Sequence, residues 1–390
     1  IPTPGVDTAT SMRLSVQPRG LAAYYPMDEG SGSVVADASS HQNDGSFVSP
    51  ATWTTPGKIG NAAVDIGGVG GSGSNAAVLI PDTDDLPRGT AMTAEAWVRQ
   101  LDWTGGAVAF MSHWNYNAPR SGAWAFQTGG NYNLRVFIAT SLTEAGDNYV
   151  DTAVNSWSQF PVWRHVAMTF DGVQSAANRV KIYIDGVQQS TTMYGTIPST
   201  ILNSDGAFSI GSFPGLGRGF NGVIDQVKLF NRTLSATEIA AEYSAQAAGA
   251  PTGLTLGTLT VGSNTALMDT IVRTDAGQYG LSIHQDHNLQ KGSDTIGAMS
   301  ASIASPGLWA EGTTKGLGFT LTAAPNLDSK WGTGSKYAAF PNTPTTFYTA
   351  TGHVSSAIDV ISSRLRLNVF GGEPQGAYTN TITISGTSLP

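Results

Sequence analysis

Short runs of alternating apolar and polar residues fill most of the chain, and Gly, Asn and Asp residues separate them. Alternation with a period of two places successive side chains on opposite faces of a β-strand. The pattern therefore predicts an all-β protein with many short strands. In the first 250 residues the clearest candidate strands are residues 76–80, 93–99, 107–112, 123–128, 133–139, 163–170, 180–184, 207–210 and 223–230.

One helix interrupts this pattern, at residues 235–244. Ser235 is suited to the N-cap position, and Glu238 follows three residues later, which is the spacing of a capping box. Immediately afterwards, the stretch AQAAGAP (245–251) is small, uncharged and ends in proline, as linkers often do. We therefore expect three parts: an N-terminal arm (1–19), a first β domain (20–247) and a C-terminal β-sandwich (248–390).

The arm contains its own strand-like stretch, residues 11–17, in which Met12, Leu14 and Val16 lie on one side. One hypothesis is that this strand pairs with the open sheet edge of a neighbouring copy, making Met12, Leu14 and Val16 subunit contacts. Repeated donation of this kind would build a filament of identical subunits. The alternative is an edge strand that pairs within its own chain.

The amino-acid composition limits the classes of partner that we expect for this protein. Charged residues are only 12% of the chain and the formal net charge is −8, so a nucleic-acid partner, which requires clustered basic residues, is not expected. No apolar run is long enough for a membrane-spanning helix. The chain has no cysteine, which excludes disulfides and thiolate chemistry. This uncharged, glycine-rich composition favours an extracellular or cell-surface location.

Several motifs occur in a family-specific order. They are AYYPMDEGSGSVVADASSHQNDG near residue 23, MTAEAWVR at 92–99, WRHVAMTFDG at 163–172, VKIYIDGV at 180–187, and FNGVIDQVKLFNRTLSATEIAAEY at 220–243. Together they resemble the laminin-G-like, concanavalin A-like lectin/glucanase superfamily. The resemblance implies that residues 20–247 form a jelly roll of two antiparallel sheets with one short helix.

The same resemblance implies a calcium site at Asp37, Asn43, Asp44 and Asp225. These residues match the family's ion-binding turn and the acidic position of its closing strand. Calcium prefers a mixture of carboxylate, amide and backbone carbonyl oxygens, and this turn is rich in such groups. The alternative is that the same side chains only cap turns, as Asp and Asn often do.

The sequence favours binding over catalysis. Glycoside hydrolysis in this superfamily uses two carboxylates that face one sugar, and no Glu-x-Asp-x-Glu strand is present. Trp114, Tyr116, Asn117 and Arg120 lie in a turn-like segment, where we expect exposed rings and polar groups to bind a glycan. The sequence thus predicts a non-enzymatic adhesive or structural lectin-like protein. The alternative function is a glycan-active hydrolase of the same superfamily.

Overall fold

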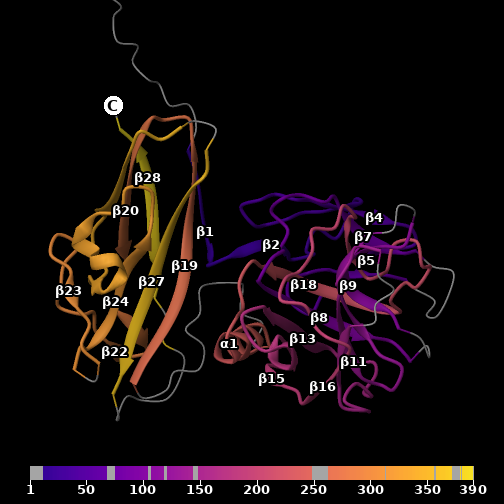
Figure 1. The fold of residues 1–390 in the computed structure, drawn as a ribbon. Helices are drawn as coiled ribbons and strands as arrows, with labels where there is room; N and C mark the ends of the chain where they lie inside the picture. Colours follow the sequence, from indigo (N-terminus) through magenta and orange to yellow (C-terminus); the bar gives the residue numbers. More distant parts are fainter. Residues whose placement is uncertain are drawn as a thin grey trace, which may run out of the picture. The chain divides into compact units, whose positions relative to one another are not determined.

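A computed structural model provides the three-dimensional structure, shown in Figure 1. It describes residues 12–67, 75–103, 107–117, 121–143, 148–247, 262–311, 313–354, 357–370, 378 and 380–389. Contacts divide the chain into two units. One comprises residues 20–253, and the other comprises residues 1–19 together with residues 254–390. Strands dominate both units, which confirms the predicted all-β fold class.

Two antiparallel sheets form the first unit. The nine-stranded sheet runs in the order β16 (Thr191–Tyr194), β12 (Tyr149–Thr152), β11 (Leu134–Ile138), β10 (Ser121–Thr128), β9 (Ala109–Asn115), β17 (Phe208–Ile210), β7 (Ala77–Ile80), β4 (Gly45–Val48) and β3 (Val34–Val35). The eight-stranded sheet contains β15 (Val187–Gln188), β14 (Val180–Ile184), β13 (Arg164–Asp171), β8 (Ala91–Gln100), β18 (Gly222–Phe230), β6 (Ala63–Asp65) and β5 (Thr52–Thr54), with β2 (Leu21–Tyr25) paired to β18. This is the expected jelly roll.

The alternation in the sequence decides which side chains fill the core between these sheets. On β8, Met92, Ala94, Ala96 and Val98 join the large hydrophobic cluster of the first unit. The intervening positions, such as Trp97, point to the opposite face of the sheet. Part of this outer face of the eight-stranded sheet is covered by the helix at residues 236–247.

The helix α1 (Ala236–Ala247) lies next to β15 in Figure 1. Its start is the predicted capping box: the backbone N–H of Glu238 donates to Ser235 Oγ, and the backbone N–H of Ser235 donates to the Glu238 carboxylate. Ile239 packs with Tyr183 and Phe230 on the outer side of the eight-stranded sheet. A 3-10 turn, η1 (Ala176–Asn178), lies between β13 and β14.

The second unit is a β-sandwich, as predicted. Its four-stranded sheet runs β1 (Met12–Pro18), β19 (Gly262–Thr274), β27 (Asp359–Val369) and β24 (Gly316–Ala323), and its three-stranded sheet runs β26 (Thr345–Thr351), β20 (Gln278–Gln285) and β28 (Ile382–Ser388). Smaller elements are β21 (Leu289–Lys291) with β22 (Asp294–Ile296), β23 (Gly307–Leu308) with β25 (Lys336–Tyr337), and the 3-10 helix η2 (Ser329–Gly334). Val272, Phe319, Trp331 and Ile361 belong to its core.

The N-terminal arm pairs within its own chain. Strand β1 is antiparallel to β19, with Met12 opposite Thr274, Leu14 opposite Val272 and Val16 opposite Thr270. The strand-donation hypothesis, in which Met12, Leu14 and Val16 contact another subunit, is therefore replaced by its alternative. Backbone hydrogen bonds that a neighbouring copy would have supplied are made by β19 instead.

Candidate functional site

Three aromatic residues lie in one row across the nine-stranded sheet. In the strand register Phe137 of β11 is opposite Tyr149 of β12, and Tyr149 is opposite Tyr194 of β16. We call Phe137, Tyr149 and Tyr194 the aromatic row. The row lies on the outer face of the sheet, because neighbouring positions such as Val136 and Val150 belong to the core between the sheets.

The rings of the aromatic row contact one another. The centroids of Phe137 and Tyr149 are 5.3 Å apart with edge-to-face geometry, and those of Tyr149 and Tyr194 are 4.7 Å apart and stacked. Tyr194 is 46% exposed, so the row is open to solvent at the β16 edge of the sheet. The row therefore presents a continuous apolar surface on an exposed sheet face.

A polar row runs beside the aromatic one, displaced by two residues along each strand. It consists of Gln127, Arg135, Asp151 and Thr192, which are successive cross-strand neighbours. Arg135 forms two hydrogen bonds of 2.6 Å to the Asp151 carboxylate, and its guanidinium carbon lies 3.8 Å from the Tyr149 ring centroid. Burial alone lowers the pKa of Arg135, but bonding to Asp151 outweighs it and raises this pKa above its ordinary value.

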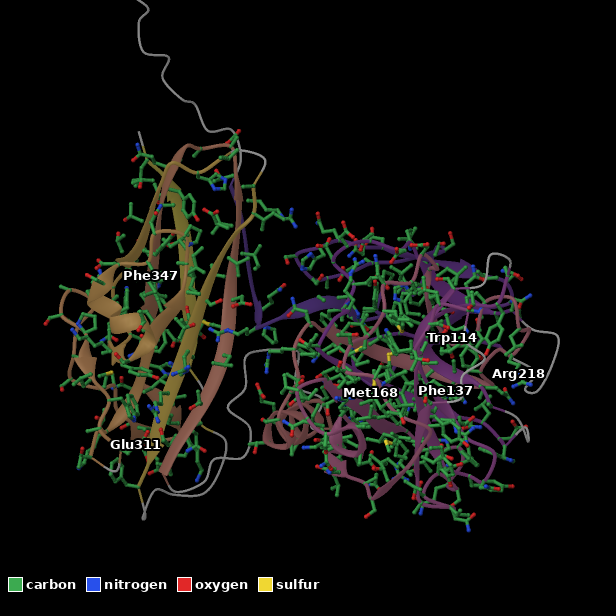
Figure 2. All side chains as sticks on the ribbon, in the orientation of Figure 1. Trp114, Phe137, Met168, Arg218, Glu311 and Phe347 are labelled. Atoms are coloured by element: carbon green, nitrogen blue, oxygen red, sulfur yellow. The ribbon has the colours of Figure 1, made fainter. Side chains whose placement is uncertain are left out.

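The residues expected to bind a glycan lie next to Phe137, at the end of the aromatic row that is farthest from β16. We call this the closed end of the row. Figure 2 shows Trp114 close to Phe137, and their ring centroids are 6.3 Å apart. Trp114 also stacks on Tyr116, which is half-buried, and Asn117 is exposed. Arg120 lies outside the described residues.

The expectation that Trp114 is exposed is wrong, because its side chain is only 1% exposed. The reason is the residue opposite on β10, Gly122, which has no side chain to hold the indole away from the sheet. A Cβ at Gly122 would lie 2.5 Å from the Trp114 ring. Trp114 therefore packs against Phe137 at the closed end of the row. Its own ring is buried and does not offer a face to a ligand.

The acidic turn expected to bind calcium is closed by its own hydrogen bonds. Asp37 Oδ1 accepts from the backbone N–H groups of Tyr24 and Ser39, and Oδ2 accepts from Ser39 Oγ and the backbone N–H of Asn43, at 2.8–3.0 Å. Both oxygens of Asp37 are thus occupied by donors. This is the bonding pattern of a carboxylate that caps a turn.

Asn43 and Asp44 complete the same turn. Asp44 Oδ1 accepts from the backbone N–H of Asp37, and the Asn43 carbonyl accepts from the Tyr25 hydroxyl. Burial, together with the charges of Asp37 and Asp44, raises the pKa of Tyr25 above its ordinary value. The hydroxyl therefore stays protonated and remains a donor.

Asp225 lies on β18 and binds a different segment, the loop of residues 58–62. Its Oδ2 accepts from the backbone N–H groups of Lys58 and Ile59, whereas its buried Oδ1 has no hydrogen-bond partner. Burial raises the pKa of Asp225 to about 7, and the charge of Asp28 also raises it. Asp28 Oδ1 accepts from backbone N–H groups at the other end of this loop.

The structure therefore brings Asp37, Asn43 and Asp44 together, and it places Asp225 at a separate loop with Asp28. Across the described parts of the chain, no three His, Asp or Glu side chains gather closely enough to hold a metal ion. Asp28 is not one of the calcium ligands predicted from the sequence. The signal was its position in the opening motif, where it precedes Glu29 and Gly30 in a turn-like stretch.

A buried charged cluster lies beneath α1. Lys228 Nζ contacts carboxylate oxygens of both Glu95 and Glu242, and His165 lies 3.8 Å from Glu95. Burial, reinforced by Glu242, raises the pKa of Glu95 to about 8, while burial and Lys228 lower the pKa of His165 to about 3. A raised carboxyl pKa is typical of general acids. Glu95 has no exposed surface, however, so a substrate does not reach it and the cluster is structural.

The comparisons with known proteins assign the fold of the first unit. Residues 72–240 match the family model Laminin_G_3, described as the concanavalin A-like lectin/glucanases superfamily. The jelly roll is therefore a concanavalin A-like domain, which confirms the family resemblance. No curated protein sequence matches the chain. Among the helices of the described residues, none is long and apolar enough to cross a membrane.

Solved structures of similar shape include a sialidase from Trypanosoma rangeli in complex with sialic acid, with 16% identity, a TM-score of 0.44, and coverage of 60% of this chain and 34% of the sialidase. Domain 4 of an extracellular arabinanase from Geobacillus stearothermophilus, in complex with arabinotriose, has 18% identity and a TM-score of 0.42, with 57% and 98% coverage. The botulinum neurotoxin serotype G binding domain has 14% identity and a TM-score of 0.42, with 79% and 69% coverage.

The chain spans about a third of the length of the sialidases that it matches. At these identities and TM-scores the likeness concerns the fold and assigns no activity to this chain. The predicted assembly of a filament by strand donation is wrong, because β1 pairs with β19 of its own chain. Two of the three structures come from glycan-active enzymes, which is the class of the alternative prediction, a glycan-active hydrolase of the same superfamily.

Proposed function

We propose that this protein acts on glycans and that the outer face of its nine-stranded sheet binds the saccharide. The observation that carries the proposal is the strand register, which aligns Phe137, Tyr149 and Tyr194 in one row. Neighbouring strands are separated by about 4.8 Å, so three rings on adjacent strands extend over roughly 10 Å. A row of this length suits a short stretch of a saccharide chain.

Pyranose rings carry C–H groups on their faces, and aromatic rings offer these faces a complementary apolar surface. Binding sites for such ligands combine aromatic surface with a few fixed polar groups. The polar row supplies those groups: Arg135 is held in place by Asp151, and Thr192 lies next along the row. The bidentate pair fixes the guanidinium, so a sugar hydroxyl meets a donor that is already oriented.

The charge of this surface favours a neutral glycan. The positive charge of Arg135 is matched by the ion-paired carboxylate of Asp151 at 2.6 Å. An acidic sugar would therefore gain little from Arg135 and would meet the negative charge of Asp151 nearby. Both carboxylate oxygens of Asp151 already accept hydrogen bonds from Arg135.

The proposal is tested by binding of neutral polysaccharides to the wild-type protein and to Tyr149→Ala, which removes the central ring. We expect about tenfold weaker binding, equivalent to about 1–2 kcal/mol for one stacked aromatic ring. Trp53→Ala is the matched control, since Trp53 is a half-buried aromatic residue of β5 in the opposite sheet. Equal loss in both variants, or no binding of any neutral glycan by the wild-type protein, contradicts the proposal.

The same polysaccharides decide whether the bound glycan is also cleaved. Release of reducing ends by the wild-type protein indicates hydrolysis, and intact chains that remain bound indicate recognition alone. The extracellular location expected from composition remains a prediction.

For the calcium ion expected from the sequence, we propose Asp225 and Asp28 as the carboxylate ligands in place of Asp37. The unpartnered, buried Oδ1 of Asp225 is an acceptor that a cation would satisfy. A second carboxylate, Asp28, lies near enough to raise the pKa of Asp225. Calcium also accepts backbone carbonyl and water oxygens. The loop of residues 58–62 turns backbone N–H groups toward both carboxylates, so these further ligands would come from other segments or from solvent.

A further inference from the structure

An open pocket lies on the other sheet of the jelly roll. It is a cavity of about 700 Å³ on the outer side of the eight-stranded sheet, where the end of α1 meets β8 and the segment before β13. Its lining includes Lys58, Trp97, Arg99, Trp163, Arg164 and Asp185. Small-molecule sites range from roughly 300 to 1,000 Å³, so the cavity has the size of a ligand site.

The floor of the cavity is rigid. Trp97 is only 3% exposed, its Nε1 donates a 2.6 Å hydrogen bond to Gln246 Oε1, and its ring stacks on Tyr243 of α1 at 5.7 Å between centroids. Tyr243 in turn packs closely on Gly186, where the hairpin turn between β14 and β15 has φ of 76°, a conformation that favours glycine. The surfaces that meet a ligand are thus fixed before it binds.

The cavity carries excess positive charge in a chain of net charge −8. Its only acidic lining residue, Asp185, is ion-paired with Arg164 at 2.6 Å and also accepts from the backbone N–H of His165. Within the described residues, no ion pair joins Lys58 or Arg99 to a carboxylate. Two cationic side chains therefore face the cavity without a counter-ion among the described residues.

Both of these cations lie against aromatic rings. Lys58 Nζ is 4.4 Å from the Trp97 ring centroid, and the guanidinium carbon of Arg99 is 5.3 Å from that of Trp163. Arg99 Nε is buried and has no hydrogen-bond partner. The two cation–π contacts hold both cations at the cavity wall, where the remaining N–H donors of Arg99 and the ammonium of Lys58 would pair with an anionic ligand.

We propose that this cavity binds an acidic sugar, a residue that bears a carboxylate on a pyranose ring. Its carboxylate would pair with Arg99 and Lys58, and the apolar face of its ring would pack on the half-buried Trp163. An isolated inorganic anion would satisfy the cations and leave the indole of Trp163 unused. The proposal goes beyond the proposed function, because it concerns a second site, on the opposite sheet, with the opposite preference for ligand charge.

The test is calorimetric titration of the full chain with digalacturonate, with its neutral counterpart galactobiose, and with inorganic sulfate. We expect digalacturonate to bind and its affinity to fall as salt screens the two cations. Arg99→Gln and Lys58→Gln should each weaken that binding by about 10- to 100-fold, the range for loss of a hydrogen bond to a charged group. Lys181→Gln is the charge-matched control, since Lys181 is exposed on β14 and lies outside the cavity lining.

Three results would overturn the proposal. Equal binding of galactobiose would show that the anionic group is not recognised, and equal binding of sulfate would show that the sugar ring is not. Loss of affinity in Lys181→Gln as large as in Arg99→Gln would place the anion elsewhere. Tyr149→Ala separates this proposal from the proposed function, because it should leave digalacturonate binding unchanged whether or not the aromatic row binds neutral glycans.

Discussion

The backbone of Gly122 lies so close to the indole of Trp114 that a Cβ at this position would be 2.5 Å from the ring. The two residues face each other on neighbouring strands, β10 and β9. Trp114 contacts Gly122, Tyr116 and Phe137. It therefore holds the ring of Phe137 in place at the closed end of the aromatic row. A glycine thus determines the position of a large aromatic side chain on the next strand.

Substitution of this glycine should displace the tryptophan. We expect Gly122→Ala to lower the free energy of unfolding by about 1–3 kcal/mol, the usual cost of overpacking a buried site. Urea denaturation followed by tryptophan fluorescence measures it. Gly130→Ala is the control, because a Cβ at Gly130 meets no atom within 4 Å. If both variants have wild-type stability, the close packing of Trp114 on Gly122 is not present in solution.

The buried cluster under α1 should make stability depend on pH. In the folded protein the pKa of Glu95 is about 8, above its ordinary value of 4.5, so the folded state holds one more proton than the unfolded state between these values. The stabilisation is complete below about pH 4.5 and is lost as the pH rises through 8. His165, with its pKa lowered to about 3, has the opposite effect at lower pH, and its stabilisation is lost as the pH falls from 6.5 towards 3.

The two effects separate between pH 7 and 9, where His165 is neutral in both the folded and the unfolded state. In this window the free energy of unfolding of the wild-type protein should fall with rising pH, and Glu95→Gln should reduce that fall. Urea denaturation at several pH values measures both slopes. An identical slope in the variant would mean that Glu95 is already ionised in the folded protein, held by Lys228.

Calcium should stabilise the jelly roll through Asp225. We expect added calcium to raise the melting temperature of the wild-type protein and to have little effect on Asp225→Asn, which removes one charge from the site. Differential scanning calorimetry with calcium or with chelator measures the difference. Asp37→Asn is the matched control. It should lower stability equally with and without calcium, because the Asp37 carboxylate holds the turn through four hydrogen bonds. A calcium response lost only in Asp37→Asn would restore the original assignment.

Removal of residues 1–18 should destabilise the C-terminal sandwich. Without β1, the edge of β19 loses its hydrogen-bonding partner along seven residue pairs. We expect the melting temperature of this unit to fall by about 2–4 °C for each kcal/mol lost, with no change in oligomeric state by size-exclusion chromatography. A truncated protein that melts normally but no longer assembles would favour donation of the arm to a neighbouring copy.

The local features of the fold follow directly from the sequence. The alternation at residues 180–184 predicts a strand that the structure places at Val180–Ile184, and the Ser235–Glu238 spacing predicts a capping box that forms as expected. Both depend on residues that are close in the chain. The register between distant strands does not, because no single sequence reveals which residues stand opposite one another.

This distinction explains what the sequence missed at the candidate site. Tyr149 and Tyr194 are stacked neighbours in the sheet, although 45 positions separate them in the chain. Trp114 was expected to be exposed because its local segment resembles a turn, and its burial depends on Gly122 of the next strand. Asp37 and Asp225 match one family pattern, but Asp37 caps its own turn and Asp225 binds the loop of residues 58–62.

The pairing of β1 with β19 also constrains how the protein is made. Pro18 is opposite Met268, which is synthesised 250 residues later. At about 5–20 residues per second, a ribosome needs roughly 12–50 s to cover that interval. During this time β1 has left the exit tunnel with its edges unsatisfied, while the intervening jelly roll can already fold. In a nascent chain of this protein the β1 segment therefore stays unpaired and hydrated until translation reaches β19.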